Sequence, residues 1–441
     1  MAEEELAIAE RVTRLALEAG ANEAEATCTV ARRFSVEARD REVVKVEQAV
    51  ARGIGLRVFL GGAKAALSTS DLSHDGLRDA VARTVEAARY VGADPHAGLP
   101  ETAPIASGDL AIDAGDVRMR PHEAKVADAL ALERIVREDH RIVNSSGSRV
   151  ADVVTTIALA NSRGAGAMYR ASQASVGSSP IARDGDDKRT ASYGSAARSY
   201  AALEPVHSVA ATAARRATDA IGARKPATMR CAVIFERDVA ALVLSDLFAA
   251  VNAANVAIGN SFLSRRIGDA IGSDRVTIVD DGRLRAGLGT SPFDAEGVPT
   301  RRTVVFERGV LRTFLYDTYY ARRLGASTTG NASGGGVGPT NFMLLPGDAS
   351  LAELVATTAC GILVTDTIGF ATESVTGTYS RGARGFVIEG GELAYPVDEF
   401  TIASDLVSML AGVDAVADDL VLDQNVVSPS FRVAEMTVSG A

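Results

Sequence analysis

A stretch rich in glycine and arginine, GTYSRGARGFVIEGG at residues 377–391, contains the side chains best suited to bind a ligand. It ends in Gly390-Gly391, with a short apolar run on either side, and this pattern predicts a β-hairpin. Arginine side chains at the base of a hairpin donate charge-assisted hydrogen bonds to a carboxylate or to a peptide backbone. They serve equally well to fix the hairpin itself, and the sequence leaves both roles open. The candidate groove residues of this stretch are Tyr379, Ser380, Arg381 and Arg384.

A second glycine-rich segment, GNASGGGVGPTN at residues 330–341, raises the question of a phosphate-binding loop. A P-loop requires a lysine followed by Ser or Thr at the start of a helix. This segment has no lysine, and it continues beyond Pro339 as an extended run instead of the helix that a dinucleotide-binding loop also needs. We therefore expect a mobile loop that borders a cleft, with Asn331 and Asn341 as candidates to contact a peptide. Whether this loop orders on binding cannot be read from the sequence.

No catalytic residue or metal ligand can be assigned from residue types and spacing. The helix of a zinc protease carries two histidines one turn apart, with a glutamate as general base. All five histidines precede residue 225, and Ala127 breaks this pattern after the one His-Glu pair, His122-Glu123. No Gly-x-Ser-x-Gly motif marks a serine nucleophile either. The side chains that stay open for a hydrolytic site of another kind are Asp246, Asp281, Asp294 and Cys360.

The composition of the 441-residue chain excludes several classes of function. A formal charge of −10 and a pI near 5.2 leave no basic excess to neutralise phosphates, so we expect no nucleic-acid partner. No apolar run reaches the roughly 18 residues of a membrane span. The acidic N-terminus does not fit a signal peptide, and the three cysteines lie too far apart for a disulfide framework. We therefore expect a cytoplasmic protein without a membrane segment.

Apolar periodicity and turn residues predict an α+β fold and divide the chain into three units. Residues 1–92 are expected to place two helices, at 3–19 and 74–90, on an antiparallel sheet. Residues 93–224 begin with a proline-rich connector and continue with strands between two helices. Within that second unit, the segment Asn144-Ser145-Ser146-Gly147 is predicted to be a turn between strands.

The third predicted unit, residues 225–441, is rich in strands and is expected to be a largely β, barrel-like domain. It opens with a strand at 229–235 and a helix at 237–254. Arg308-Gly309 marks a second hairpin, and Asp280-Asp281 before a glycine is predicted to be a turn.

The third unit resembles the TldD/PmbA family over most of its length. The resemblance rests on an ordered series of segments: RVTIVDDG, SPFDAEGVPTRRTVVFERGVLRTFLYDTYYARRLG, STTGN, PTNFMLLPGD and TGTYSRGARGFVIEGGELAYPVDEFTIASDL. The N-terminal half matches more loosely. Members of this family have been called modulators of DNA gyrase and are understood as subunits of a cytoplasmic metalloprotease. The resemblance therefore implies a role in proteolysis.

TldD-type members of the family carry His-Glu-x-x-x-His at the start of the third unit and a cysteine near the C-terminus, which together hold zinc. The corresponding helix here, ALVLSDLFAAVNAAN at 241–255, has no histidine, and its one acid is Asp246. The segment between Asp419 and Pro429 has no cysteine. The resemblance therefore implies no catalytic residue, no metal ligand and no cofactor in this chain.

The segments YSRGARGF and MTVSG are most similar to the PmbA branch, also called TldE, whose members resemble non-catalytic partners. This implies a heterodimer with a TldD-type chain that carries the zinc, or else a homodimer. The expected substrates are unfolded or leader-bearing peptides, held in a groove to which this chain contributes. Two other hypotheses stay open: a stand-alone regulatory protein that binds another protein, and an enzyme that uses the four side chains named above. Neither the peptide nor the partner can be identified from the sequence.

Overall fold

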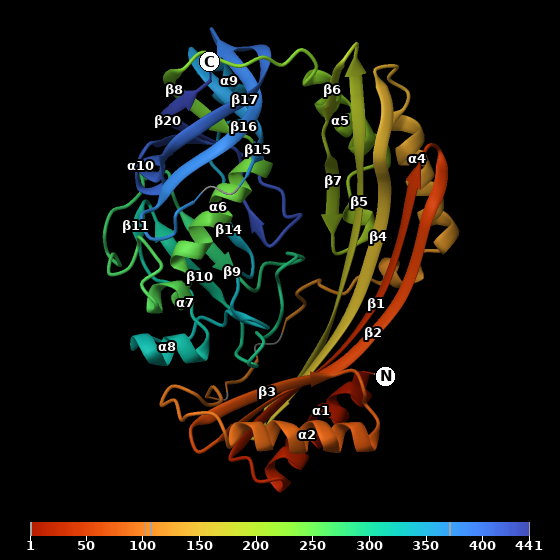
Figure 1. The fold of residues 1–441 in the computed structure, drawn as a ribbon, viewed down its shortest axis with the longest axis vertical. Helices are drawn as coiled ribbons and strands as arrows, with labels where there is room; N and C mark the ends of the chain where they lie inside the picture. Colours follow the sequence, from red (N-terminus) through yellow and green to blue (C-terminus); the bar gives the residue numbers. More distant parts are fainter. Residues whose placement is uncertain (1, 102, 106–107, 370–371, 441) are drawn as a thin grey trace.

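The structure is a computed structural model that describes residues 2–101, 103–105, 108–369 and 372–440. It consists of a long curved sheet with helices at both ends, and a C-terminal domain that faces the concave side of this sheet (Figure 1). The predicted α+β architecture is confirmed. Among the helices of the described residues, none is long and apolar enough to cross a membrane.

The N-terminal sheet contains seven strands in the order β3-β2-β1-β4-β5-β6, with β7 also paired to β5. Its strands are β1 (Glu23–Arg39), β2 (Glu42–Leu60), β3 (Ala63–Thr69), β4 (Ile142–Asn161), β5 (Gly166–Asp184), β6 (Asp187–Thr190) and β7 (Tyr193–Ala197). The helices of this part are α1 (Ala2–Glu18), α2 (His74–Ala88), α3 (Gly115–Met119), α4 (His122–Val136) and α5 (Val206–Asp219), with a 3-10 turn η1 at Tyr200–Ala202. Each pair of neighbours is antiparallel, as predicted. One sheet thus contains strands of both the first and the second predicted unit.

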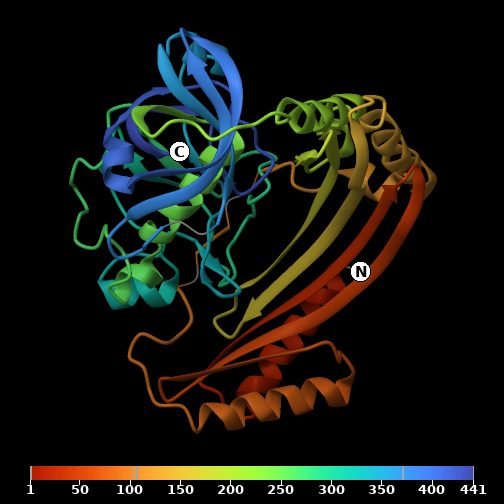
Figure 2. The ribbon, with the colours of Figure 1, turned by 45° about the horizontal axis from the view of Figure 1, so that its top comes forward.

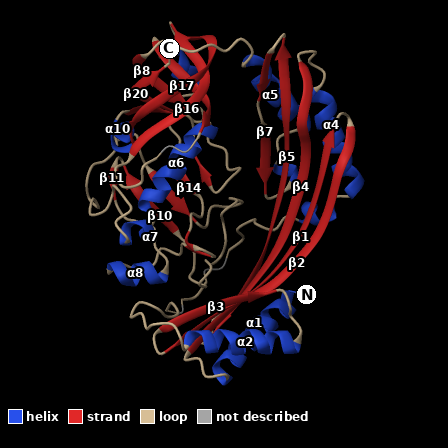
Figure 3. Ribbon diagram, in the orientation of Figure 1, coloured by secondary structure: helices blue, strands red, loops and turns tan. Residues whose placement is uncertain are grey.

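Two separate apolar clusters fix helices to the two ends of this sheet (Figure 3). At the lower end in Figure 3, Val12 of α1 and Leu77 of α2 are buried in one cluster with Val58 of β2. At the upper end, Leu132 of α4 and Val209 of α5 belong to a second cluster. The amphipathic periodicity of these helices is therefore satisfied by opposite ends of a single sheet.

The predicted turn at residues 144–147 is wrong, because this segment belongs to strand β4. The ladder between β4 and β5 shifts its register between Ser145 and Ser148 but continues beyond them. Both hydroxyl groups donate to the buried carboxylate of Glu133 on α4, at 2.8 and 3.0 Å. The strand can run through this polar segment because its buried hydroxyl groups have hydrogen-bond partners.

The C-terminal domain contains a closed five-stranded barrel, which confirms the barrel-like domain predicted from the sequence. Its strands pair in the order β17-β16-β15-β8-β20, and pairing between β17 and β20 closes the ring. They are β8 (Met229–Phe235), β15 (Cys360–Ile368), β16 (Thr378–Glu389), β17 (Glu392–Asp405) and β20 (Phe431–Ser439), with β18 (Val413–Val416) added at β20. The hairpins predicted at Gly390-Gly391 and Arg308-Gly309 are both present.

A second sheet and helix α6 (Arg237–Val251) complete this domain. The sheet has the order β11-β10-β9-β14-β19, with β9 (Ile278–Asp281), β10 (Arg302–Glu307), β11 (Val310–Leu311), β14 (Phe342–Leu344) and β19 (Val426–Val427). Helix α6 contacts β15 of the barrel and β14 and β19 of this sheet. It ends earlier than predicted because Asn252 caps the next helix, accepting a hydrogen bond from the Ala254 amide at 2.9 Å. The remaining short elements are α7 (Ala253–Ala257), α8 (Thr318–Leu324), α9 (Leu351–Ala356), α10 (Leu406–Ala411), β12 (Ala332–Ser333) and β13 (Gly336–Val337).

Candidate functional site

The C-terminal half of α6 meets the start of strand β16 through a partly buried ion pair. Arg381 Nη2 donates to Asp246 Oδ2 at 2.8 Å, and Thr372 Oγ1 donates to the same oxygen at 2.8 Å. The side chains of Arg381 and Asp246 are only 11% and 19% exposed. Tyr379 lies two residues before Arg381, on the same face of β16. Its buried ring has its centroid 5.8 Å from the guanidinium carbon of Arg381. We call these three residues, Asp246, Tyr379 and Arg381, the α6–β16 site.

Two donor groups of the α6–β16 site have no hydrogen-bond partner among the described residues. They are the Tyr379 hydroxyl and Nε of Arg381. Burial raises the pKa of Tyr379 well above its usual range, so this hydroxyl keeps its proton and remains a donor. A carbonyl or carboxylate oxygen is the kind of ligand atom that such donors bind.

A cavity of about 570 Å³ lies between the barrel and the part of the chain formed by β6 and α5. Its apolar wall includes Val239 and Leu242 of α6. Asp246 follows Leu242 by four residues and Val239 by seven, so all three side chains share one helix face. The cavity and the α6–β16 site are therefore neighbours along the same helix.

Arg384 lines this cavity from strand β16, at a point where both neighbouring ladders shift register. Such a bulge redirects the side chain relative to a regular strand. Arg384 Nε donates to Asp398 Oδ1 at 3.1 Å, and Arg189 Nη1 of β6 donates to Asp398 Oδ2 at 2.6 Å. Asp398 thus ties the two walls of the cavity together. Sequence reasoning missed Arg189 and Asp398, because no local signal marks two partners that are 209 positions apart.

Asn331 and Asn341 stand near the two ends of the glycine-rich segment, and both hold it in place. The buried carboxylate of Asp280 accepts hydrogen bonds from Asn331 Nδ2 at 2.7 Å and from the Thr340 amide and hydroxyl at 2.9 and 2.7 Å. Asn341 Nδ2 donates to the Asp281 carbonyl at 2.6 Å. Between these anchors the segment forms the β12–β13 hairpin. The turn predicted at Asp280-Asp281 is therefore wrong: both residues belong to strand β9, where Asp280 fastens the segment.

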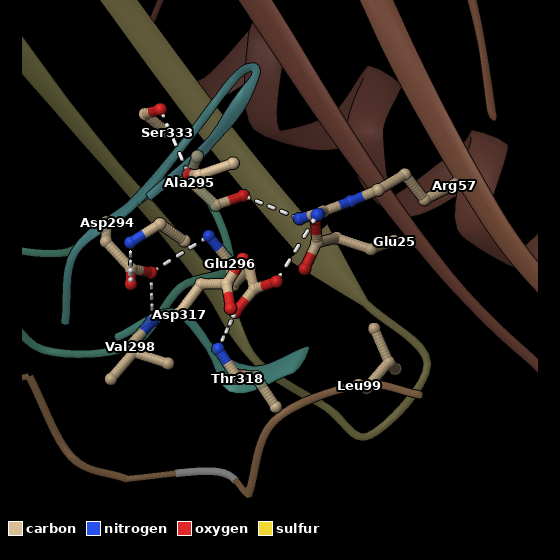
Figure 4. Close-up of polar contacts among 12 residues, drawn as sticks. Glu25, Arg57, Leu99, Asp294, Ala295, Glu296, Val298, Asp317, Thr318 and Ser333 are labelled. Carbon is tan, nitrogen blue, oxygen red and sulfur yellow. Dashed lines mark hydrogen bonds and ion pairs between the residues drawn. The ribbon is translucent and has the colours of Figure 1, made fainter. Parts of the chain in front are cut away.

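Asp294, one of the acids left open for another kind of catalysis, lines a second cavity of about 250 Å³. Burial and the neighbouring Glu296 raise the pKa of Asp294 to about 7, a value that suits a general acid or base. Its oxygens, however, accept hydrogen bonds from the backbone amides of Glu296, Val298 and Ala332, each at 2.9 Å (Figure 4). This bonding gives Asp294 a structural role, because it joins the loop at 294–298 to the glycine-rich segment.

The same loop is tied to the N-terminal sheet by Arg57 of β2 (Figure 4). The guanidinium donates to the Ala295 carbonyl at 2.8 Å and forms ion pairs with Glu296, at 3.5 Å, and with Glu25 of β1. Burial raises the pKa of Glu25, and the charge of Arg57 opposes that shift. This cluster therefore holds the sheet against the C-terminal domain.

The remaining two open side chains lie apart from both cavities. Asp281 forms an ion pair with Arg302 at 3.8 Å. Cys360 is an exposed free thiol at the start of β15. In neither case does a hydrogen bond or ion pair among the described residues join the side chain to Asp246 or Asp294.

The structure does not bring the six predicted groove residues together. Tyr379 and Arg381 belong to the α6–β16 site, and Arg384 lines the larger cavity. Ser380 is exposed on strand β16. Asn331 lines the smaller cavity, and Asn341 is buried at the base of the glycine-rich segment.

Three family models match the chain in order. They are described as PmbA/TldA metallopeptidase domain 1, at residues 24–88, the central domain, at 116–221, and the C-terminal domain, at 228–440. The metalloprotease PmbA homolog of Haemophilus influenzae is 34% identical over 435 residues, which cover 97% of this chain and 94% of that protein. This chain belongs to the PmbA/TldD family.

Solved structures share the fold over its whole length. A putative modulator of DNA gyrase from Bacteroides thetaiotaomicron superposes with a TM-score of 0.92 at 25% identity, covering 99% of this chain and 98% of that one. TldE from Thermococcus kodakarensis superposes with a TM-score of 0.90 at 19% identity, covering 98% and 100%. The PmbA/TldD resemblance inferred from the third unit therefore extends through the N-terminal sheet.

Because the PmbA/TldD family is named for metallopeptidases, the side chains around α6 must be tested as zinc ligands. A catalytic zinc site takes about three protein ligands. Within the described residues, no group of three or more His, Cys, Asp and Glu side chains is arranged to hold a metal ion. Asp246 offers one carboxylate, and that group already binds Arg381 and Thr372. The donor set around α6 does not fit a zinc ion.

Proposed function

We propose that this chain is the non-catalytic, TldE-type subunit of a heterodimeric metalloprotease, and that a TldD-type partner carries the zinc and the catalytic residues. The observation that carries the proposal is the ion pair between Asp246 and Arg381. The helix that supplies metal ligands in TldD-type relatives corresponds here to α6, where a guanidinium occupies the carboxylate. A second cation at this carboxylate would have to displace a permanent positive charge.

The contribution of this subunit is to hold an extended peptide. The larger cavity has an apolar wall for a substrate side chain, and Arg384 stands among its charged groups. The Tyr379 hydroxyl and Arg381 Nε are buried donors without a partner among the described residues, so they reach the carbonyl group of a peptide only when the start of β16 moves. These features support an unfolded or leader-bearing peptide as the substrate.

Cleavage of an unstructured peptide tests this function. The assay compares this chain alone, a TldD-type protein of the same organism alone, and the equimolar mixture. We expect cleavage by the mixture, none by this chain alone, and none when the metal-ligating histidines of the partner are replaced. Cleavage by this chain alone would overturn the proposal.

A variant of the cavity separates peptide holding from subunit pairing. Leu242→Asp places a charge on the apolar wall, at a side chain that is already 42% exposed. We expect this variant to pair with the partner as the wild type does and to raise KM for the peptide. An unchanged KM would remove the cavity from the substrate path.

A further inference from the structure

Two of the three cysteines, far apart in the sequence, are brought together in the barrel of the C-terminal domain. Strands β8 and β15 run parallel in an unshifted register over four consecutive pairs, the first of which is Ala232 opposite Gly361. Cys231 and Cys360 each precede this first pair by one residue, and each still belongs to its strand. Continuing the register by one residue therefore places the two cysteines side by side on neighbouring strands.

The two cysteine side chains also share one face of the barrel wall. Side chains alternate between the two faces of a strand, so Cys231 lies on the face of Val233 and Cys360 on the face of Ile362. Cys231, Val233 and Ile362 all belong to the same apolar cluster. Neighbouring strands lie about 4.8 Å apart, inside the range of about 4.4–6.8 Å that the Cα atoms of a disulfide span. The pair therefore meets the backbone requirement for a disulfide bond.

The two thiols differ in their access to solvent. Cys231 is only 7% exposed, whereas Cys360 is an exposed thiol at the first residue of β15. Burial raises the pKa of Cys231 to about 11, and the neighbouring Cys360 adds to this shift. Cys231 therefore keeps its proton at neutral pH, and Cys360 is the thiol that an oxidant can reach. The third cysteine, Cys28, is fully buried in the apolar cluster beneath α1 and α2 of the N-terminal sheet.

We propose that Cys231 and Cys360 form a reversible disulfide bond when the chain meets a disulfide oxidant such as oxidised glutathione. In Figure 2 the yellow-green chain that follows α5 crosses to the C-terminal domain and enters the barrel as β8. The bond fastens this first strand of the domain to β15, at the end of the barrel where both parallel strands begin. The pair is thus a redox-sensitive modification site.

The reaction is two successive thiol–disulfide exchanges. The thiolate of Cys360 attacks one sulfur of oxidised glutathione, the sulfur–sulfur bond of that molecule breaks, and one glutathione leaves. Cys231 then gives up its proton and attacks Sγ of Cys360, and the second glutathione leaves. The two cysteines lose two hydrogens in all, and one oxidised glutathione becomes two molecules of reduced glutathione.

Neither cysteine belongs to the α6–β16 site or lines the two cavities described above, so this inference is independent of the proposed subunit function. To test it, the purified chain is incubated with millimolar oxidised glutathione, blocked with N-ethylmaleimide and mapped by mass spectrometry without reduction. We expect two peptides joined through Cys231 and Cys360, and a free thiol only at Cys28. Treatment with dithiothreitol should restore all three thiols.

Replacement of each cysteine separates the two steps. In Cys231→Ala we expect one glutathione to remain attached to Cys360, because no second thiol is present to displace it. In Cys360→Ser both remaining thiols are buried, and we expect both to stay reduced. Cys28→Ala is the matched control, since it removes a buried cysteine outside the barrel and should form the disulfide to the same extent as the wild type.

A bond between strands remote in sequence restricts the unfolded chain, so oxidation should raise the midpoint of urea unfolding in the wild type and in Cys28→Ala but not in Cys360→Ser. Circular dichroism verifies that each variant is folded. A wild type that keeps three free thiols, a glutathione that stays on Cys360 although Cys231 is present, a disulfide between two chains, or an unchanged midpoint after oxidation would each overturn the proposal.

Discussion

Arg381 and Asp246 lie where neither charge is well hydrated, so each depends on the other. The hydroxyl of Thr372 adds a third polar group to the same carboxylate oxygen. The one carboxylate of α6 is therefore already held by a guanidinium and a hydroxyl, an arrangement suited to orienting neighbouring side chains. This is the residue-level basis for assigning a holding role to the chain.

Removal of Arg381 leaves Asp246 without its charge partner at a largely buried position. We expect Arg381→Ala to lower the free energy of unfolding by about 2–4 kcal/mol in urea titrations. The matched control is Arg83→Ala on α2, whose partner Asp79 is 3.6 Å away and whose side chain is 70% exposed. That variant should cost less than about 1 kcal/mol. Equal losses in the two variants would show that the α6–β16 pair is not the stabilising contact described here.

Asp294 gives the protein a defined dependence on pH. Burial and Glu296 raise its pKa to about 7 from the ordinary value of 3.8. The folded protein therefore binds this proton more tightly than the unfolded chain does. This contribution to the free energy of unfolding is fully present below pH 3.8, the ordinary pKa of Asp, and it is lost as pH rises through about 7.

Asp294→Asn removes this titration. Between about pH 5 and pH 8, we expect the unfolding free energy of the wild type to fall by about 2 kcal/mol relative to that of the variant. The hydrogen bonds altered by the amide shift the variant by a constant amount, so the change with pH is the informative quantity. Parallel curves for the two proteins would contradict the assignment.

At the scale of elements, β16 is shaped by one close approach to β15. A Cβ atom at Gly385 would lie 1.8 Å from the carbonyl oxygen of Leu363, so only glycine fits there. This approach occurs at the bulge that presents Arg384 to the larger cavity. The position of Arg384 in the larger cavity therefore depends on the glycine beside it, which lines the same cavity.

Gly385→Ala is expected to lower the unfolding free energy by at least about 2 kcal/mol, because the backbone of β15 must move. Gly55→Ala on β2 is the matched control, since a Cβ atom there has no neighbour within 4 Å. The control should be neutral or slightly stabilising, because alanine restricts the unfolded chain. Thermal unfolding of both variants makes the comparison, and a loss of similar size in Gly55→Ala would remove the steric explanation.

Elements with strong local signals could be predicted from the sequence. The predictions that were wrong share one cause. The strand at 229–235 and the hairpin at Arg308-Gly309 follow from apolar runs and a glycine turn. Asn144-Ser145-Ser146-Gly147 has equally good turn residues, yet Ser145 and the nearby Ser148 donate to Glu133 from within strand β4. Local propensity does not include a buried partner supplied by another element.

At the scale of the whole molecule, the sheet and the C-terminal domain are joined by contacts between residues far apart in sequence. Arg57 reaches the Ala295 carbonyl across 238 positions, and Arg189 reaches Asp398 across 209. The larger cavity exists only because of this docking. The sequence therefore singled out Arg384, which lines this cavity, but it predicted neither the cavity nor the separation of the asparagines from the arginines.

The metal content of the separated subunits tests the central claim most directly. This chain, a TldD-type protein of the same organism, and their complex are each purified by size exclusion and assayed for zinc. The account predicts zinc in proportion to the TldD-type protein, in the free partner and in the complex, and no stoichiometric zinc in this chain alone. About one zinc per chain in the protein purified alone, together with cleavage of a peptide, would contradict it.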